Sequence, residues 1–196
     1  MLPTYDEEAK LLQNYELKLQ YYSPADQKNI TRMLKKANAP EDGDMLDVGC
    51  GDGRAYWYAH RHNMSYVGVD YSAARVAKAK EETMLDIPVS PVFHCADLYK
   101  FLPIINGRFS LVFCCEVLEH LKNPSLIWEH IKQRTGIMAV CSVPVNMPHK
   151  NHLQVYRNEA QLREAFPGIT NLYSMMFDTG SRKRKHFVFT YEPGAA

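Results

Sequence analysis

The spacing of apolar residues changes several times along this chain. Short runs typical of strands are followed by segments in which apolar residues recur every three or four positions, as on one face of a helix. We expect a loop with one turn over 97–108. The predicted strands are 44–50, 65–70, 91–96, 109–115, 136–143, 170–177 and 186–191, and the predicted helices among them are 53–62, 72–83, 118–134 and 158–166.

This alternation predicts a parallel sheet. Strands separated by helices at such intervals are joined by right-handed crossover connections. The run 109–115 is apolar nearly throughout, as in a central strand covered on both faces. The last two strands are joined by residues 178–185 with Gly180 in the turn, and this spacing predicts a β-hairpin.

Two helices are expected before the first strand. Thr4 and Glu7 form a capping box ahead of an amphipathic helix that runs to Tyr22, and Ser23 with Pro24 begins a second helix. A chain of 196 residues can bury one good core. We therefore expect a single domain, 1–196, with a helical cover over 1–40 and an α/β core over 44–191.

Charge, apolar runs and cysteine spacing argue against nucleic acid, a membrane span and a zinc site. The chain has 23 Lys and Arg against 22 Asp and Glu, so no global field favours nucleic acid. No apolar run approaches the roughly 20 residues of a membrane span. The N-terminus lacks the features of a secretory signal, so we expect a cytoplasmic protein of unspecified oligomeric state. The five cysteines show no Cys-x-x-Cys spacing, which indicates reduced structural thiols rather than a zinc site.

The segment 45–53 is the strongest candidate for ligand binding. It is an apolar strand that runs into Gly49, Gly51 and Gly53, where missing side chains allow close approach and the backbone amides are expected to hold an anionic group. The dinucleotide-binding fingerprint needs a further glycine at position 54, which is Arg54. A dehydrogenase is therefore not expected.

With Asp47 two residues before the first glycine, the segment resembles motif I of the class I S-adenosylmethionine-dependent methyltransferases, of the small-molecule type. The resemblance covers roughly residues 20–191. It implies a Rossmann-like, doubly wound α/β fold, with a seven-stranded, mostly parallel sheet, helices on both faces and a C-terminal β-hairpin. The order of strands in the sheet is implied by the family alone.

Three later features agree with this resemblance. Asp70 ends a strand 17 residues after Gly53, where an acid can accept both hydroxyls of a ribose, although N-cap duty beside Ser72 is the alternative role. In the family, the acid and the neighbouring apolar residue at Asp97–Leu98 contact adenine. Residues 116–121 closely match a Glu-Val-Leu-Glu-His-Leu sequence seen in many small-molecule methyltransferases. The predicted S-adenosylmethionine site comprises Asp47, Gly49, Cys50, Gly51, Gly53, Asp70, Tyr71, Asp97, Leu98, Glu116 and, from the helical cover, Tyr22.

The cofactor implies methyl transfer to an oxygen or nitrogen of a small polar metabolite or sugar. A hydroxyl acceptor must lose a proton, and His120 is the best candidate base because histidine ordinarily titrates near neutral pH. Glu116 is four residues earlier and would share a face with it in a helix. Both are predicted to be catalytic. Alternatively, Glu116 contacts the cofactor or caps a turn, and His120 only orients it.

Two other functions remain open. Glu116, Glu119 and His120, with His149 or His152, are similar to the metal ligands of the small-RNA 3′-terminal 2′-O-methyltransferases, which would make the chain a Mg²⁺-dependent ribose methyltransferase. The other is a non-catalytic protein that keeps the fold and activates a partner. In the preferred interpretation no metal is expected.

Overall fold

A computed structural model of the protein describes residues 24–83, 90–179 and 182–195. The predicted first helix, including Tyr22, lies outside these ranges. Within them no helix is both long and apolar enough to cross a membrane. The helices are α2 Pro24–Ala37, α3 Tyr56–Arg61, α4 Ala73–Thr83, α5 Leu98–Ile104, the 3₁₀ turn η1 Leu118–His120, α6 Pro124–Arg134 and α7 Glu159–Ala165. The strands are β1 Asp44–Val48, β2 Ser65–Asp70, β3 Val92–Cys95, β4 Phe109–Cys115, β5 Thr135–Pro144, β6 Asn171–Asp178 and β7 Lys183–Tyr191.

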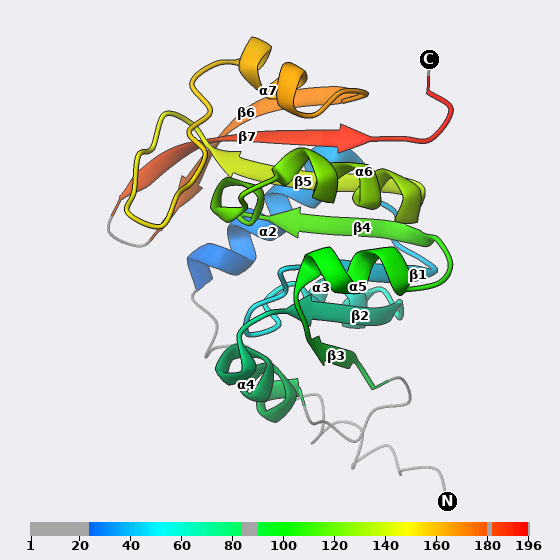
Figure 1. The fold of residues 1–196 in the computed structure, drawn as a ribbon. Coiled ribbons are helices and arrows are strands. Elements are labelled where there is room, and N and C mark those ends of the chain that lie inside the picture. Colours follow the sequence, from blue (N-terminus) through cyan, green and yellow to red (C-terminus); the bar gives the residue numbers. More distant parts are fainter. Residues whose placement is uncertain (1–23, 84–89, 180–181, 196) are drawn as a thin grey trace, which may run out of the picture.

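The strands form one seven-stranded sheet in the order β3-β2-β1-β4-β5-β7-β6 (Figure 1). The first five strands are parallel, and β7 runs antiparallel to both β5 and β6. The predicted mostly parallel α/β sheet with a C-terminal hairpin is confirmed. Chain order reverses between β1 and β4, and in open α/β sheets ligands bind at the carboxyl ends of strands beside such a switch point.

Helices cover both faces of the sheet. On one face α2, α3 and α4 bury apolar residues such as Met33, Trp57 and Ala79. On the other, α5, α6 and α7 bury Leu102, Trp128 and Leu162. Successive residues of a strand point to opposite faces, so β1, β2, β4 and β5 contribute to both cores, whereas β3 contributes only Phe93, to the first.

The segment predicted as a loop with one turn before β4 is instead a helix of seven residues. Asp97 is the N-cap of α5, because its carboxylate accepts a hydrogen bond from the backbone N–H of Tyr99 at 2.9 Å. Leu98 and Leu102 anchor α5 on the sheet. The helix ends at Ile104, one residue after Pro103.

The single helix predicted over 118–134 is two elements. The 3₁₀ turn η1 ends at His120, and α6 begins at Pro124 with Asn123 as its N-cap. Proline cannot donate a hydrogen bond inside a helix, but it is well tolerated in the first turn, so it separates the two. Glu116 precedes η1 with φ of +56°, so Glu116 and His120 do not share the helix face that their spacing predicted.

Candidate cofactor and acceptor site

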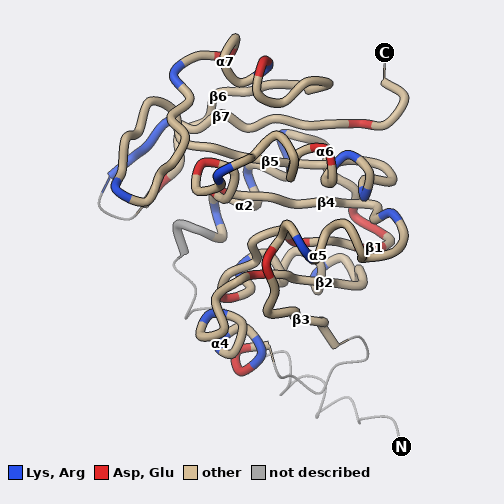
Figure 2. The backbone as a smooth tube through the Cα atoms, viewed as in Figure 1, with Lys and Arg blue, Asp and Glu red and all other residues tan. Residues whose placement is uncertain are grey.

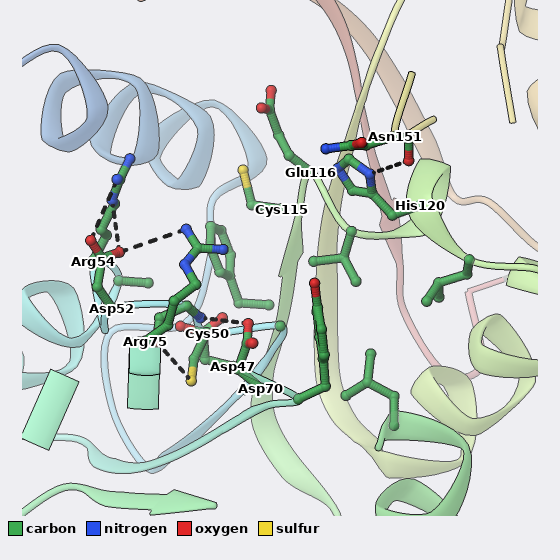
Figure 3. A pocket seen from close by; sticks show the side chains of 18 of the residues that line it. Asp47, Cys50, Asp52, Arg54, Asp70, Arg75, Cys115, Glu116, His120 and Asn151 are labelled. Carbon is green, nitrogen blue, oxygen red and sulfur yellow. Dashed lines mark hydrogen bonds and ion pairs between the residues drawn. The ribbon is translucent and has the colours of Figure 1, made fainter. Parts of the chain in front are cut away.

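A large cleft opens at the carboxyl ends of β1, β2 and β4. Its volume of about 1440 Å³ exceeds the 300–1,000 Å³ of a typical small-molecule pocket, so it has room for two ligands side by side. Figure 3 shows Asp47, Cys50, Asp70 and Arg75 grouped in one part of the cleft and Glu116 with His120 in another. We call the first part the glycine-loop end and the second the acceptor end.

The loop 49–53 is held by hydrogen bonds within the protein. The amides of Gly49 and Cys50 donate to the Val69 carbonyl at 2.8 and 3.0 Å, and the Gly53 amide donates to the Cys50 carbonyl. The Gly51 amide donates to Asp70 Oδ2 at 3.0 Å. The expected cradle of open amides is therefore wrong at these four positions, because β2 has already taken most of their donors.

What the glycines provide is space and an unusual backbone. All three have positive φ, between 55° and 80°. A Cβ on Gly51 would lie 3.0 Å from the Arg75 guanidinium, at the cleft wall. A Cβ on Gly53 would meet Ala79 and Phe93, and Gly53 does not line the cleft. Gly53 thus permits close packing of α4 and β3 beneath the loop, a role that sequence reasoning did not assign to it.

Asp70 is the carboxylate that shapes the glycine-loop end. It is only 4 % exposed and lines the cleft. Oδ2 accepts from the Gly51 amide, and Oδ1 accepts from the Ser72 amide at 2.8 Å. Each carboxylate oxygen has two acceptor lone pairs, so each keeps one after these contacts. Asp70 thus ties the loop to the residue before α4 and also lines the cleft, and its contact with a ribose stays a prediction.

Asp47 lies deeper and is paired with a residue that the sequence did not indicate. The Tyr66 hydroxyl donates to Asp47 Oδ2 at 2.6 Å, and Asp47 is 3 % exposed. Burial, reinforced by the charge of Asp70, raises the pKa of Asp47 to about 7 even though the Tyr66 hydrogen bond opposes the shift. Burial, with the charge of Asp47, also raises the pKa of the Cys50 thiol. Cys50 is therefore an inert wall of the cleft.

A small cluster of charges lies at the rim of this end. Arg54 Nε contacts Asp52 Oδ1 at 2.9 Å, and Lys78 Nζ contacts Asp52 Oδ2 at 3.4 Å. Burial would raise the pKa of Asp52, but Arg54 and Arg75 hold it below its usual value. Arg75 reaches over Gly51 and is half-exposed, so it offers a cation to a ligand on the loop. Nothing in the local sequence marks Arg75 for this role.

Tyr71, predicted to bind the cofactor, and Asp97 with Leu98, expected at its adenine, also line the cleft. Tyr71 is 82 % exposed and follows Asp70 directly. Asp97 and Leu98 lie at the start of α5, where Leu98 is buried and Asp97 is exposed. An aromatic ring, an apolar side chain and a carboxylate are thus gathered beside the glycine loop, as the sequence predicts.

Glu116 is the carboxylate at the acceptor end, and its partner is a buried histidine. His186 Nε2 in β7 faces Glu116 Oε1, and His186 is 1 % exposed. Burial works to raise the pKa of Glu116, but His186 and the charges of Arg184 and His152 bring it below its usual value. Glu116 is therefore ionised at neutral pH. His186 was not among the predicted site residues, because it lies 70 positions later in the chain.

His120 lines the acceptor end with a defined tautomer. Its Nδ1 lies 2.8 Å from the Asn151 carbonyl, which can only accept, so Nδ1 carries the proton (Figure 3). Nε2 is then the basic nitrogen and lies 3.9 Å from Glu119 Oε1. An imidazole that a carbonyl orients through one nitrogen can act as a general base through the other.

His120 is one of three side chains that converge at one point. Glu119, His120 and His152 each offer a ligand atom, and these atoms lie within 4.8 Å of one another. We call them the Glu119 triad. His152 Nδ1 lies 2.8 Å from the Met147 carbonyl, so its Nε2 is also the unprotonated nitrogen, and burial lowers the pKa of His152. Among the described residues, neither His149 nor Glu116 belongs to this group.

Glu119 is a buried ionisable side chain beside the cleft. It is 1 % exposed, and among the described residues its Oε2 has no hydrogen-bond partner. Burial raises the pKa of Glu119 from 4.5 to about 8. In the absence of a cation, Glu119 is therefore mostly protonated at neutral pH.

Several proteins similar to this chain are named as methyltransferases. A family model described as a methyltransferase domain matches residues 46–135. A ubiquinone biosynthesis O-methyltransferase of Bradyrhizobium is 32 % identical over 108 residues, which cover 54 % of this chain and 40 % of that protein. The chain spans 33–42 % of the length of the first curated relatives that it matches.

Solved structures share the fold at lower identity. The N-methyltransferase NodS of Bradyrhizobium japonicum, in complex with S-adenosylhomocysteine, superimposes with a TM-score of 0.68 and 15 % identity, covering 93 % of this chain and 98 % of that one. The magnesium protoporphyrin IX methyltransferase of Synechocystis, with bound S-adenosylmethionine, gives 0.66 and 20 % identity, covering 86 % and 80 %. The resemblance inferred from the glycine loop is thereby confirmed: the chain has the fold of the S-adenosylmethionine-dependent methyltransferases, and residues 46–135 match a model described as a methyltransferase domain.

Proposed function

We propose that this protein transfers a methyl group from S-adenosylmethionine to an oxygen or nitrogen of a small polar metabolite or sugar. The observation that carries the proposal is one shared cleft, in which Asp70 and the glycine loop lie at one end and Glu116 with His120 at the other. The match to a methyltransferase domain supports the reaction class. The relatives named as O-methyltransferases and the neighbour named as an N-methyltransferase support these two acceptor atoms.

The residues of the glycine-loop end fit S-adenosylmethionine. The cofactor supplies a methyl group on a sulfonium, which transfers by in-line displacement. The open lone pairs of Asp70 suit the two ribose hydroxyls. The bare Cα of Gly51 and the cation of Arg75 suit the amino-acid tail and its carboxylate. Tyr71, Asp97 and Leu98 suit adenine.

The acceptor end fits a group that carries a proton to be removed. His120 Nε2 takes the proton of an acceptor hydroxyl as the oxygen gains the methyl group, while Asn151 holds the imidazole through Nδ1. Glu116, ionised at neutral pH, accepts a hydrogen bond from the acceptor. Phe177 and Ile30 line the same cleft and restrict its water.

Calorimetric titration with S-adenosylhomocysteine, followed by a screen of a metabolite extract with isotope-labelled S-adenosylmethionine, tests this function. We expect saturable binding and a labelled small molecule. His120→Gln should retain S-adenosylhomocysteine affinity and lose roughly 100-fold or more in turnover of a hydroxyl acceptor. His130→Gln, on α6 and hydrogen-bonded to Gln133, is the matched control and should behave as wild type. Binding without any methyl transfer would favour the non-catalytic alternative, and no binding would refute the proposal.

The Glu119 triad favours a second candidate, the metal-dependent methylation of a ribose hydroxyl. Two imidazoles, each oriented through Nδ1 by a backbone carbonyl, and a buried carboxylate are a donor set that fits a divalent cation. Such a cation would also neutralise the buried Glu119, whose Oε2 has no hydrogen-bond partner among the described residues. Figure 2 shows basic residues in blue at the start of β7. Arg182, just before this strand, and Lys183, Arg184 and Lys185 within it are exposed.

Metal titration separates the two candidates. If the second is correct, chelator-treated protein should bind Mn²⁺ or Mg²⁺ with measurable heat, Glu119→Gln and His152→Gln should abolish that heat, and RNA methylation should require the metal. The control His149→Gln removes a neighbouring imidazole that lies outside the triad and should bind the metal normally. No heat with either ion, together with chelator-resistant methylation of a small molecule, would eliminate the second candidate.

A further inference from the structure

The buried His186 joins two parts of the fold that are far apart in sequence. It lies opposite Pro144 in the β5–β7 ladder, and the Glu116 amide donates to the Ser142 carbonyl at 3.1 Å at the same edge of the sheet. His186 Nε2 thereby faces Glu116 Oε1 as an ion pair, directly behind the acceptor end of the cleft. The contact depends on the C-terminal hairpin lying beside β5.

The imidazole of His186 is fixed on three sides. Its Nδ1 lies 3.1 Å from the Arg184 carbonyl, and its ring stacks on Phe177 with centroids 4.1 Å apart and 19° between the planes. Both ring nitrogens face oxygen acceptors, and a neutral imidazole has only one N–H. The Nε2 contact with Glu116 is close but does not have hydrogen-bond geometry, so the two groups meet as a charge contact in which a protonated ring would pair with the carboxylate.

Glu116 presents its carboxylate to the cleft from a constrained backbone. Its φ of +56° is uncommon for a residue with a side chain, and such conformations persist where the surroundings enforce them. The side chain is 44 % exposed, so one part contacts His186 and the other remains open to the cleft. Among the described residues, Arg184 and His152 also lower the pKa of Glu116, and the charge of Glu116 acts in turn on Glu119 and Cys115.

We propose that His186 is a positioning residue, which holds the Glu116 carboxylate at the acceptor end so that it receives an N–H or O–H of the acceptor. His186 is buried and reaches the acceptor only through Glu116. The inference rests on the proposed function for the identity of the bound molecule, whereas the ion pair itself can be tested without any acceptor.

Imidazole ¹⁵N NMR of the full chain at pH 7 tests the ion pair. We expect both nitrogens of His186 to be protonated in the wild type and the Nε2 resonance to move in Glu116→Gln. The control Glu129→Gln replaces a half-exposed carboxylate on α6, paired with Lys132, and should leave the resonance unchanged. An unprotonated Nε2 in the wild type, or one that ignores Glu116→Gln, would overturn the proposal.

Two replacements of His186 test its effect on the acceptor. A glutamine side chain can donate an N–H to Glu116, whereas methionine fills similar space without a donor, so the pair His186→Gln and His186→Met isolates the hydrogen bond from packing. We expect His186→Met to lose roughly 100-fold in kcat/KM for the acceptor and His186→Gln to keep most of it, with S-adenosylhomocysteine affinity within about twofold in both. In a Glu116→Gln background, His186→Met should cost nothing further.

A purely structural role predicts a different pattern. Both variants would then lose activity in proportion to their stability, and the loss would persist in the Glu116→Gln background, which would overturn the proposal. A wild-type protein that methylates no acceptor would count against the proposed function instead, and the ¹⁵N resonances would still decide whether the pair exists.

Discussion

Gly51 lines the cleft with bare backbone. Its φ is +55°, and an added Cβ would point at the Arg75 guanidinium 3.0 Å away. We expect Gly51→Val to weaken S-adenosylhomocysteine binding by at least about tenfold, or ~1.4 kcal/mol. The measurement is calorimetric titration of folded protein.

Gly107→Val is the matched control for this change. Gly107 also has positive φ, +86°, but no atom lies within 4 Å of its missing Cβ. The control therefore carries similar backbone strain without reaching the cleft, and it should bind the ligand normally. Equal losses in the two variants would mean that strain, rather than intrusion into the site, explains the effect.

Asp70→Ala removes a carboxylate that serves both the loop and the cleft. We expect it to weaken S-adenosylhomocysteine binding by an amount on the order of 2–4 kcal/mol, because two charge-assisted hydrogen bonds are lost. It should also lower the free energy of unfolding, since the amides of Gly51 and Ser72 lose their acceptor. Titration and urea denaturation measure the two effects separately.

Asp44→Ala separates stability from binding. Asp44 Oδ1 accepts from the Ser110 amide at 2.7 Å and from its hydroxyl at 3.1 Å, at the amino end of β1 away from the cleft. It should reduce stability to a comparable degree and leave affinity unchanged. If affinity falls equally in both variants, Asp70 has no direct part in the site.

Residues whose chemistry is evident from the local sequence could be predicted. Asp47, Gly51, Asp70, Glu116 and His120 all line the cleft, because each ends or follows a strand at the same edge of the sheet. Arg75 and His186 could not be found in this way. Arg75 is one of many charged residues on α4, and His186 meets Glu116 only through strand pairing between β5 and β7.

At the scale of elements, α2 is fastened to the hairpin beside the acceptor end. The side-chain amide of Asn29 donates to the backbone carbonyl of Asp178 at 2.6 Å, and the backbone amide of Asp178 donates to Asn29 Oδ1 at 3.0 Å. Asn29 is 5 % exposed. We expect Asn29→Ala to lower the free energy of unfolding by about 1–3 kcal/mol, because two backbone groups lose their partner.

Arg32→Ala is the companion variant on the same helix. Arg32 also donates to β6, to the Met176 carbonyl at 3.2 Å, but at an exposed position. Water can replace that bond, so the loss should stay below about 0.5 kcal/mol in urea denaturation. If the two variants prove equally unstable, the buried hydrogen bonds of Asn29 contribute no more to the free energy of unfolding than the exposed one of Arg32.

The strands were easier to predict than the helices. β2 and β4 have the predicted bounds, 65–70 and 109–115, and in β4 burial on both faces leaves a nearly continuous apolar run. α5 was missed because seven residues with an internal proline show too few apolar repeats. The segment 118–134 keeps a helical apolar period across its break, so periodicity alone could not reveal that α6 restarts at Pro124.

At the scale of the whole molecule, Glu119 makes stability depend on pH. Its folded-state pKa of about 8 lies above the ordinary 4.5, so the folded protein keeps a proton that the unfolded chain releases between these values. Stability from this group is fully present below about pH 4.5 and is lost as pH rises through 8. In chelator-treated protein we expect a loss on the order of 2–4 kcal/mol between pH 5 and 8.

Glu119→Gln removes this titration while keeping the shape of the side chain. Urea denaturation at pH 5, 6.5 and 8 should give a flatter stability profile for the variant than for the wild type. Asp47, with a pKa raised to about 7, contributes a slope of the same sign in both proteins and does not disturb the comparison. Parallel profiles would show that Glu119 does not hold its proton in the folded state.

The two ends of the cleft are built from different portions of the chain. The glycine-loop end is formed by residues between 47 and 98, which are synthesised early in translation. The acceptor end also depends on His186, which lies in the last strand. A nascent chain halted after α6 would already contain the residues that define the glycine-loop end. Loss of β7, by premature termination or proteolysis, would therefore leave a polypeptide that lacks His186, the partner of Glu116. The acceptor end is thus completed later in synthesis than the glycine-loop end.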